Sequence, residues 1–381
     1  DIEELYSKVD TLRQVGNKLV ADVNSFEFNC PVNFPLELNK FRANHPAIDI
    51  SASLFTNCVF NQSVWFKNTA LDFYFNDCTF NLINAHDVIF QGKMRFRECN
   101  FKKMLSLDNT SFMDLADFWH STFHEKAVFH KVDFEKTVVF SGSTFKENVL
   151  FTYTLFAKLG IFRGTICEKG FDISLSIIEG NLSIFDFELK DYIAIQGELA
   201  KMQYESLVHE VGDIPIKNKR ETFRILKNIF EKNSDHINSP YYKKLELDTY
   251  DDLLKDKIKS KINPWNNKVN RFILWLNFKS NKHGTSFYSG LVFTAIIGII
   301  FFYLSLISTN TYYATLNPFK WSIDAFTESV KYFFISLSPV HKHTYLDSLG
   351  PTTPFYIADF AGRIFVSYGI YQTIQAFRKF R

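Results

Sequence analysis

Two successive segments of the chain decide its fold: Phe-His-Lys-Val-Asp-Phe-Glu-Lys-Thr-Val-Val-Phe (129–140) and Phe-Ser-Gly-Ser-Thr-Phe-Lys-Glu-Asn-Val-Leu-Phe (140–151). In both segments Phe recurs after five and then six residues, which makes a repeat of 11. The same ladder runs from Phe96 to Phe162, and Leu107 holds the one position that lacks Phe. An α-helix turns by about 100° per residue, so these steps would carry the Phe side chains to opposite walls. The period therefore argues against a helix and favours a coil with flat sides.

A coil with sides of about five or six residues places one Phe inward at the centre of each side, and four sides close a turn of roughly 22 residues. Turns stack about 4.8 Å apart, and each turn covers the Phe layer of the one before it. The residue two places before an inward Phe is often small, because only a small side chain fits beside a stacked Phe at a corner. These small residues are Cys58, Cys78, Cys99, Thr110, Ser121, Ser143 and Thr154.

The ladder, from about residue 52 to 187, resembles the pentapeptide-repeat family in its Phe-rich form. The resemblance implies a right-handed quadrilateral β-helix and says almost nothing about function. The net charge of +2 gives no support to the strongly acidic, DNA-mimicking surface that some of these proteins use against DNA enzymes. Three of the five Cys fall at matching positions of successive turns, so we interpret them as stacked thiols rather than as a disulfide or metal site. A reducing compartment follows.

The segments on either side of the coil are predicted to be a cap and a helical linker. Residues 1–51 are expected to begin with a short amphipathic helix over 1–16, which has no signal-peptide pattern, and to continue as an irregular cap on the first turn. Residues 188–282 change to a helical period and predict a cytoplasmic linker with helices at Ile193–Val211, Lys217–Asn233 and Pro240–Ser260. Their polar faces, rich in Lys and Glu, are either solvated surfaces or a coupling element.

The C-terminal domain, residues 283–381, is predicted to enter a membrane. Phe287 to Ser308 is a run of 22 residues without a charge, long enough as a helix to span a bilayer core of about 30 Å. A second span is expected over Pro354 to Phe377. Basic residues precede the first span and follow the second, so both termini are placed on the cytoplasmic side. Residues 255–282 interleave Lys and Arg with Trp and Phe, which a membrane interface explains better than nucleic acid does.

The segment between the two spans predicts a pore. Residues 323–337 form an apolar helical pattern too short to cross a bilayer, and a re-entrant pore helix fits that length. Span, short helix, loop and span follow one another as in the two-span, pore-loop ion channels, which assemble as four subunits, and the chain resembles them. Ser336, Ser338 and Val340 match the potassium-channel version of this motif. His341 and His343 stand where that family needs Gly, so the resemblance implies a wider, weakly selective pore of either ion sign.

Within the second span, two pairs of residues have alternative roles. Asp359 and Arg363 stand four residues apart and form either an ion pair that locks the helix or part of a pore-lining ring. Gly362 and Gly369 serve either close helix packing or a gating bend.

Other polar residues are weaker candidates. Gln372 and Gln375 lie near the inner mouth and are our candidates for the cytoplasmic pore lining. Glu328, in the short helix, either takes part in permeation or serves the helix dipole. His341 and His343 have three possible roles besides the filter: they bind a metal, sense pH or simply occupy an outward-facing loop.

Together these patterns favour a multidomain protein: an oligomeric channel or pore, with a homotetramer preferred, in a bacterial inner membrane. It would pass inorganic ions and carry the β-helix as a cytoplasmic domain that senses or docks a protein partner or ligand. The alternatives are a membrane-anchored scaffold and a bacterial defence effector that permeabilises the membrane. The sequence contains no catalytic triad, P-loop, dinucleotide-binding motif or zinc spacing, so we expect neither an enzyme nor a cofactor.

Overall fold

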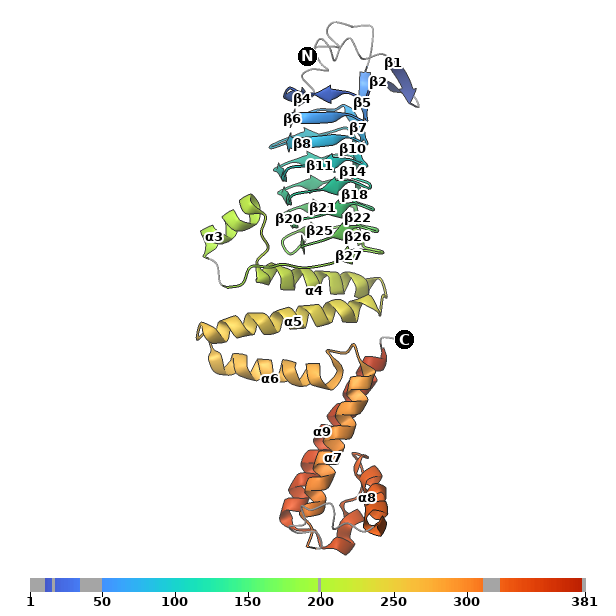
Figure 1. The fold of residues 1–381 in the computed structure, drawn as a ribbon, viewed down its shortest axis with the longest axis vertical. Coiled ribbons are helices and arrows are strands. Elements are labelled where there is room, and N and C mark those ends of the chain that lie inside the picture. The colour runs from blue at the N-terminus through green and yellow to red at the C-terminus, as the bar shows by residue number, and fades with distance from the viewer. Residues whose placement is uncertain (1–10, 16–17, 35–49, 198–199, 311–322, 379–381) are drawn as a thin grey trace. The chain divides into compact units, whose positions relative to one another are not determined.

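The computed structural model describes residues 11–15, 18–34, 50–197, 200–310 and 323–378 (Figure 1). The chain divides into two compact units, Asp1–Ile225 and Leu226–Arg381. The first unit is a coil of short strands with helical segments at its end, and the second unit is helical.

The strands of the first unit lie on four sides of a coil, stacked in layers (Figure 1). The first side holds β1 (Thr11–Val15), β2 (Lys18–Asn24), β5 (Ile50–Thr56), β7 (Asp72–Asn76), β10 (Met94–Arg97), β14 (Ala116–Asp117), β18 (Val138–Val139), β22 (Leu159–Ile161) and β26 (Asn181–Ser183). The second holds β3 (Glu27–Phe28), β11 (Asn100–Phe101), β15 (Thr122–Phe123), β19 (Thr144–Phe145), β23 (Ile166–Cys167) and β27 (Glu188–Leu189). The third holds β4 (Val32–Phe34), β12 (Leu105–Asp108), β16 (Ala127–His130), β20 (Val149–Thr152) and β24 (Phe171–Asp172). The fourth holds β9 (Ile89–Phe90), β13 (Ser111–Phe112), β17 (Asp133–Phe134), β21 (Leu155–Phe156) and β25 (Ile177–Ile178), while β6 (Val59–Phe66) and β8 (Thr79–Asn84) run across the second and third sides.

The register of these strands confirms the predicted turn. Phe101 pairs in parallel with Phe123, which pairs with Phe145, so these turns advance by 22 residues, while the earlier pairs Phe60–Phe80 and Phe80–Phe101 advance by 20 and 21. The inward rings stack along the coil: Phe118 and Phe162 lie 5.0 Å and 5.1 Å from Phe140 between ring centroids. Each Phe therefore occupies nearly the same surroundings as the Phe one turn away.

The small residues of the ladder have a second role besides fitting a corner. Each is buried, and its hydroxyl or thiol donates to a carbonyl in the neighbouring layer: Thr154 Oγ1 lies 2.6 Å from the Phe129 carbonyl oxygen, Ser143 Oγ 2.5 Å from that of Phe118, and Cys99 Sγ 3.5 Å from that of Phe75. The predicted stack of thiols is thus also a series of hydrogen-bond donors, and the five Cys are free.

Corner residues with positive φ recur every 11 residues. They include Asp87, Glu98, Asn109, His120 and Lys131, with φ between 51° and 57°, and Gly142 continues the series at 67°. Asp, Asn and Gly tolerate this left-handed conformation better than other residues. Their spacing was a signal in the sequence that the Phe ladder alone did not use.

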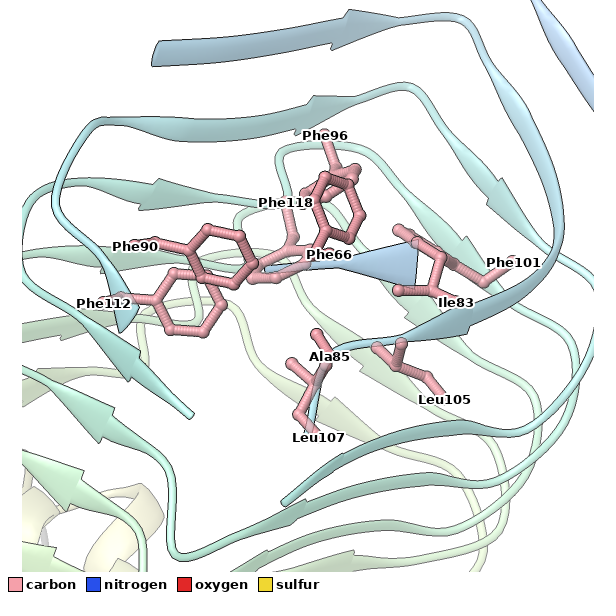
Figure 2. Close-up of a pocket in the computed structure, with 10 residues that line it drawn as sticks. All are labelled: Phe66, Ile83, Ala85, Phe90, Phe96, Phe101, Leu105, Leu107, Phe112 and Phe118. Atoms are coloured by element: carbon pink, nitrogen blue, oxygen red, sulfur yellow. The ribbon is translucent and has the colours of Figure 1, made fainter. Parts of the chain in front are cut away.

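Two successive layers of the coil lack an inward Phe on the third side, where Ala85 and Leu107 precede Phe129 in the column. Figure 2 shows the apolar void of about 10 Å³ that remains among the surrounding rings. A void of this size with apolar walls barely fits one water molecule and offers it no hydrogen-bond partner. It is a local packing defect, not a ligand site.

The start of the coil differs from the prediction. Residues 11–15 form strand β1, antiparallel to β2, so the predicted helix over 1–16 is wrong there; pairing at the sheet edge overrides the helical period of a short segment. Residues 1–10 and 35–49 lie outside the described residues. Phe28 already stacks on Phe60 at 4.5 Å, so the coil begins before the predicted boundary at residue 52.

Helical segments follow the last turn: α3 (Lys201–Glu205), a π-helical turn η1 (Ser206–Val211) and α4 (Ile216–Lys232). The predicted helix from Ile193 is wrong in its first part, because Ile195 instead forms a β-bridge with Pro215. The first half of α4 covers the end of the coil, where Asn218 Nδ2 donates to Asp172 Oδ2 at 2.9 Å. This contact satisfies a buried carboxylate that would otherwise be left at the open end of the core.

The second unit contains α5 (Asn238–Lys259), α6 (Pro264–Asn281), α7 (Phe287–Ile307), α8 (Ile323–Ser336), the 3₁₀-helix η3 (His343–Leu349) and α9 (Thr353–Phe377). The predicted basic run therefore contains a regular helix, α6. A sharp turn joins α6 to α7, because Lys282, His283 and Gly284 all have positive φ, at 51°, 59° and 89°. Helices α7 and α9 run side by side, with α8 beside α7 (Figure 1).

Candidate functional site in the helical unit

Among the described residues, α7 alone is long and apolar enough to cross a membrane. Its bounds agree with the first predicted span. Helix α9 has nearly the bounds predicted for the second span, but its membrane crossing is not confirmed, because Asp359, Arg363, Gln372 and Gln375 reduce its apolar character. The predicted two-span pore domain is accordingly not confirmed.

Glycines let α7 and α9 approach closely. A Cβ on Gly362 would lie 2.9 Å from Cβ of Phe301, and one on Gly290 would lie 2.6 Å from Thr373 Oγ1. A Cβ on Gly369 would overlap Thr294 Oγ1. Helix α9 continues through both of its glycines without a break, so the structure favours the packing role over the gating bend.

Asp359 is the centre of a buried charged network. Its Oδ2 lies 2.7 Å from Arg363 Nη2, which confirms the predicted ion pair across one turn of α9. Its Oδ1 lies 2.8 Å from His341 Nε2, and both Asp359 and His341 are almost inaccessible to solvent, at 7% and 8% exposed. The other ring nitrogen of His341, Nδ1, lies 2.5 Å from the carbonyl oxygen of Ser338.

The geometry of this network joins three side chains and one carbonyl. A carbonyl oxygen only accepts hydrogen bonds, so the Ser338 carbonyl is an acceptor for His341 Nδ1. Nε2 of the same ring faces one carboxyl oxygen of Asp359, and Arg363 occupies the other. One carboxyl group therefore holds both His341 and Arg363.

The network ties the loop after α8 to the middle of α9. The neighbouring ends of α7 and α9 are also joined, because Asn310 N donates to Gly350 O at 2.9 Å and Thr352 Oγ1 donates to Ser308 O at 2.5 Å. The segment between α8 and α9 is thereby held by the side chains of His341 and Thr352 and by the backbone contact of Gly350, in addition to its own 3₁₀-helix η3.

The predicted filter residues are not brought together within one chain. Val340 is 89% exposed, whereas His341 is buried against Asp359. Ser338 is exposed, and Ser336 Oγ donates to the carbonyl of Phe333 at 2.8 Å, which closes the end of α8. The side chain of His343 lies outside the described part of the chain.

Helix α8 has the predicted extent and packs on α7 through Phe302 and Phe333, whose ring centroids lie 5.7 Å apart. Gly298 allows this approach, since a Cβ there would lie 2.5 Å from Cδ2 of Leu337. The side chain of Glu328 lies outside the described residues, and its two predicted roles remain predictions.

Gln372 is buried inside the unit, at 4% exposed, instead of facing an open surface. Asn281 Nδ2, at the end of α6, donates to its side-chain oxygen and, at 3.1 Å, to its carbonyl oxygen. Gln375 is half-buried, with Oε1 3.5 Å from the same nitrogen. Both amides therefore hold α6 against α9, a role that their spacing on α9 did not reveal.

Metal binding at the histidines gains no support. Both nitrogens of His341 are engaged by Ser338 and Asp359. In the parts of the chain that the structure describes, no cluster of three or more His, Cys, Asp or Glu residues is arranged to hold a metal ion.

The comparisons with known proteins agree with the coil. The family model described as pentapeptide repeats (9 copies) matches residues 85–133, which lie within the four-sided coil. No curated protein and no solved structure matches the chain. The chain thus contains pentapeptide repeats that form a β-solenoid, followed by a helical region with one apolar helix that weakly indicates a membrane.

Proposed function

We propose that the protein is an oligomeric membrane channel or pore with two membrane-spanning helices, α7 and α9, and with the β-helix as a sensing or docking domain. One observation carries the proposal: the α7–α9 pair is polar inside and apolar outside. Asp359 and Gln372 of α9 are buried, while Ile357 and Phe360 of the same helix are 67% and 66% exposed.

The outer surface of this helical pair suits lipid. On α9 the exposed apolar side chains continue with Ile364 and Ile374, and on α7 they include Leu291, Ile296, Ile299, Ile300 and Leu304. A water-soluble helical hairpin would reverse this distribution, burying its apolar stripe and exposing its charges. In a bilayer, buried polar side chains with internal partners and an apolar rim are the favourable arrangement.

A pore is favoured over a simple anchor because the charged network would be costly and useless in an anchor. Burying Asp359 with Arg363 and His341 requires desolvation that hydrophobic residues would avoid. In this chain the network has a structural result: it fixes the loop after α8 against α9. In this loop Val340 is exposed. A fixed loop beside a short helix is what a pore entrance requires.

The proposed topology places both termini in the cytoplasm and the protein in a bacterial inner membrane as a multi-pass oligomer. Basic residues of α6 precede the first span, and Arg378, Lys379 and Arg381 follow the second. Four subunits and a weakly selective passage for inorganic ions follow from the resemblance to pore-loop channels. The β-helix would bind a protein partner or ligand that controls opening.

The test is reconstitution in planar bilayers with a cysteine at the exposed loop. Val340→Cys should make discrete current steps sensitive to a charged thiol reagent, whereas Ile364→Cys, on the apolar rim of α9, should not. The native Cys58, Cys78, Cys99 and Cys167 are buried and should not interfere, whereas Cys30 is half-buried and is replaced by Ser in both variants. Equal responses of the two variants would contradict the pore.

A folded oligomer that gives no current with any variant, even after a partner is bound to the β-helix, would favour the membrane-anchored scaffold. Current that collapses the membrane potential of cells producing the protein would favour the membrane-permeabilising defence effector.

A further inference from the structure

We propose that the groove between α6 and α7 binds an anionic glycerophospholipid, with the lipid phosphate at Lys279 and an acyl chain along α7. This inference rests on the proposed membrane location of α7 and goes beyond the channel itself, since it names a lipid class and its site. Its occupant is a single lipid molecule, distinct from the surrounding bilayer.

The groove is a pocket of about 360 Å³ where α6 meets the first turns of α7. The turn between the two helices is rigid, because three successive residues, Lys282 to Gly284, have positive φ and Asn281 is anchored on Gln372. The position of α6 across the start of α7 is thereby built into the fold. The lining side chains are Trp275 and Lys279 from α6 and Tyr288, Ser289, Val292, Phe293, Ile296 and Ile297 from α7.

The polar end of the groove is cationic. Helix α6 carries Lys268, Arg271 and Lys279 and contains no Asp or Glu. Arg271 is neutralised by Asp251 of α5, with Nε 2.8 Å from Oδ1. Lys279 is exposed at the groove and has no carboxylate within ion-pair distance among the residues that the structure describes. A phosphate group supplies the missing negative charge, and Tyr288 adds a hydroxyl donor.

The rest of the groove is apolar and opens along α7 through Val292 and Ile296. A soluble phosphate or nucleotide would leave this part unfilled, whereas an acyl chain would cover it. The outer side of α6 exposes Trp265, Phe272 and Trp275, side chains that favour the boundary between headgroups and acyl chains. Lys279 therefore lies where a lipid phosphate is expected, at the depth of the headgroups.

The experiment titrates the full-length protein in detergent with phosphatidylglycerol, phosphatidylcholine and glycerol 3-phosphate and counts bound molecules by native mass spectrometry. We expect saturable binding of phosphatidylglycerol that Lys279→Gln weakens roughly five-fold, corresponding to about 1 kcal/mol for one Lys near anionic lipid. Lys268→Gln removes the same charge from the same helix outside the groove and should leave binding unchanged. Val292→Trp keeps every charge but fills the groove and should abolish binding.

Three results would overturn the lipid site: equal binding of phosphatidylcholine, equal weakening by Lys268→Gln, or competition by glycerol 3-phosphate as strong as that of phosphatidylglycerol. If Val292→Trp lowers the number of subunits in the oligomer and leaves lipid binding unchanged, the groove binds a second copy of the chain. Bilayer currents of Lys279→Gln separate the two proposals. Current without saturable lipid binding refutes the groove and leaves the channel standing, whereas saturable lipid binding supports the groove even where no current is recorded.

Discussion

The two units of the protein build their cores by opposite rules. In the β-helix, each inward Phe meets its equivalent one turn away, as Phe140 meets Phe118 and Phe162. In the α7–α9 pair, each contact occurs once: Gly369 admits Thr294, and Asp359 joins His341 to Arg363. A repeated core spreads its stability over equal layers, whereas a core of single contacts depends on each of them. The expected effects of substitution test this difference.

The largest effect is expected from removing one ring of the ladder. Phe140→Ala leaves a cavity between two stacked rings and should lower the free energy of unfolding of the β-helix by about 3–5 kcal/mol. Phe185→Ala is the matched control, because Phe185 is 70% exposed on the same coil. Both are measured by denaturant unfolding of the full-length protein. Equal losses would show that the stacked column is not the source of stability.

A comparable but slightly smaller loss is expected at the charged network. Asp359→Ala removes the carboxyl group that both His341 and Arg363 contact. It should lower the free energy of unfolding by about 3–5 kcal/mol, and by less where water or lipid headgroups solvate the side chains left behind. Thermal unfolding and the yield of oligomer in size-exclusion chromatography measure it. Ile357→Ala, on the exposed side of α9, should change neither quantity, and an Asp359→Ala oligomer of normal yield would argue against a structural role for the network.

The helix contact should respond to a single added methyl group. Gly369→Ala forces α9 away from Thr294 Oγ1 and should cost about 1–3 kcal/mol. Adding Thr294→Ala removes the atom that clashes, so the double variant should regain much of the loss. Thermal unfolding distinguishes this compensation from a simple sum of two losses, which would place the strain elsewhere. Ser367→Ala, on the exposed side, is the control.

The hydrogen bonds of the ladder should each contribute less. Thr154→Val keeps the shape of the side chain but leaves the carbonyl of Phe129 without its donor, at a cost of about 1 kcal/mol. Thr144→Val makes the same change at a half-buried outward position and should be close to neutral. Denaturant midpoints of the two variants provide the comparison. If Thr144→Val lowers the stability as much as Thr154→Val does, the hydrogen bonds donated by the buried corner residues are not what stabilises the coil at these positions.

A pH-dependent loss is expected from His283. Burial and the nearby Lys244 and Lys243 together lower its pKa to about 4. In the unfolded chain its pKa is about 6.5, so the unfolded state binds the proton first and stability falls as the pH drops from about 6.5 to 4. Asp248 Oδ1, 3.6 Å from Nε2, moderates the loss. His283→Gln should flatten this part of the stability profile, and an unchanged slope would exclude His283 as its source.

The pattern of the sequence predicted the elements whose cause is local. The 11-residue ladder implied the four-sided coil, and the uncharged run implied α7. Helix α8 and the Asp359–Arg363 pair were also found, because a helical segment and an i,i+4 spacing can be recognised within a few residues. The strand at residues 11–15 was missed, since pairing with β2 decided it, and the bounds of helix α6 within the predicted helical linker were not given.

By itself, the sequence determined which residues would be repeated, apolar or charged, because periodicity and charge are properties of neighbours along the chain. Only the tertiary structure decided what the polar residues of the helical unit contact. His341 reaches Asp359 across 18 residues, and Asn281 reaches Gln372 across 91. Such contacts follow from how closely α6, α7 and α9 pack. That packing depends on single glycines and on the backbone geometry of turns, which the periodicity of the sequence does not reveal.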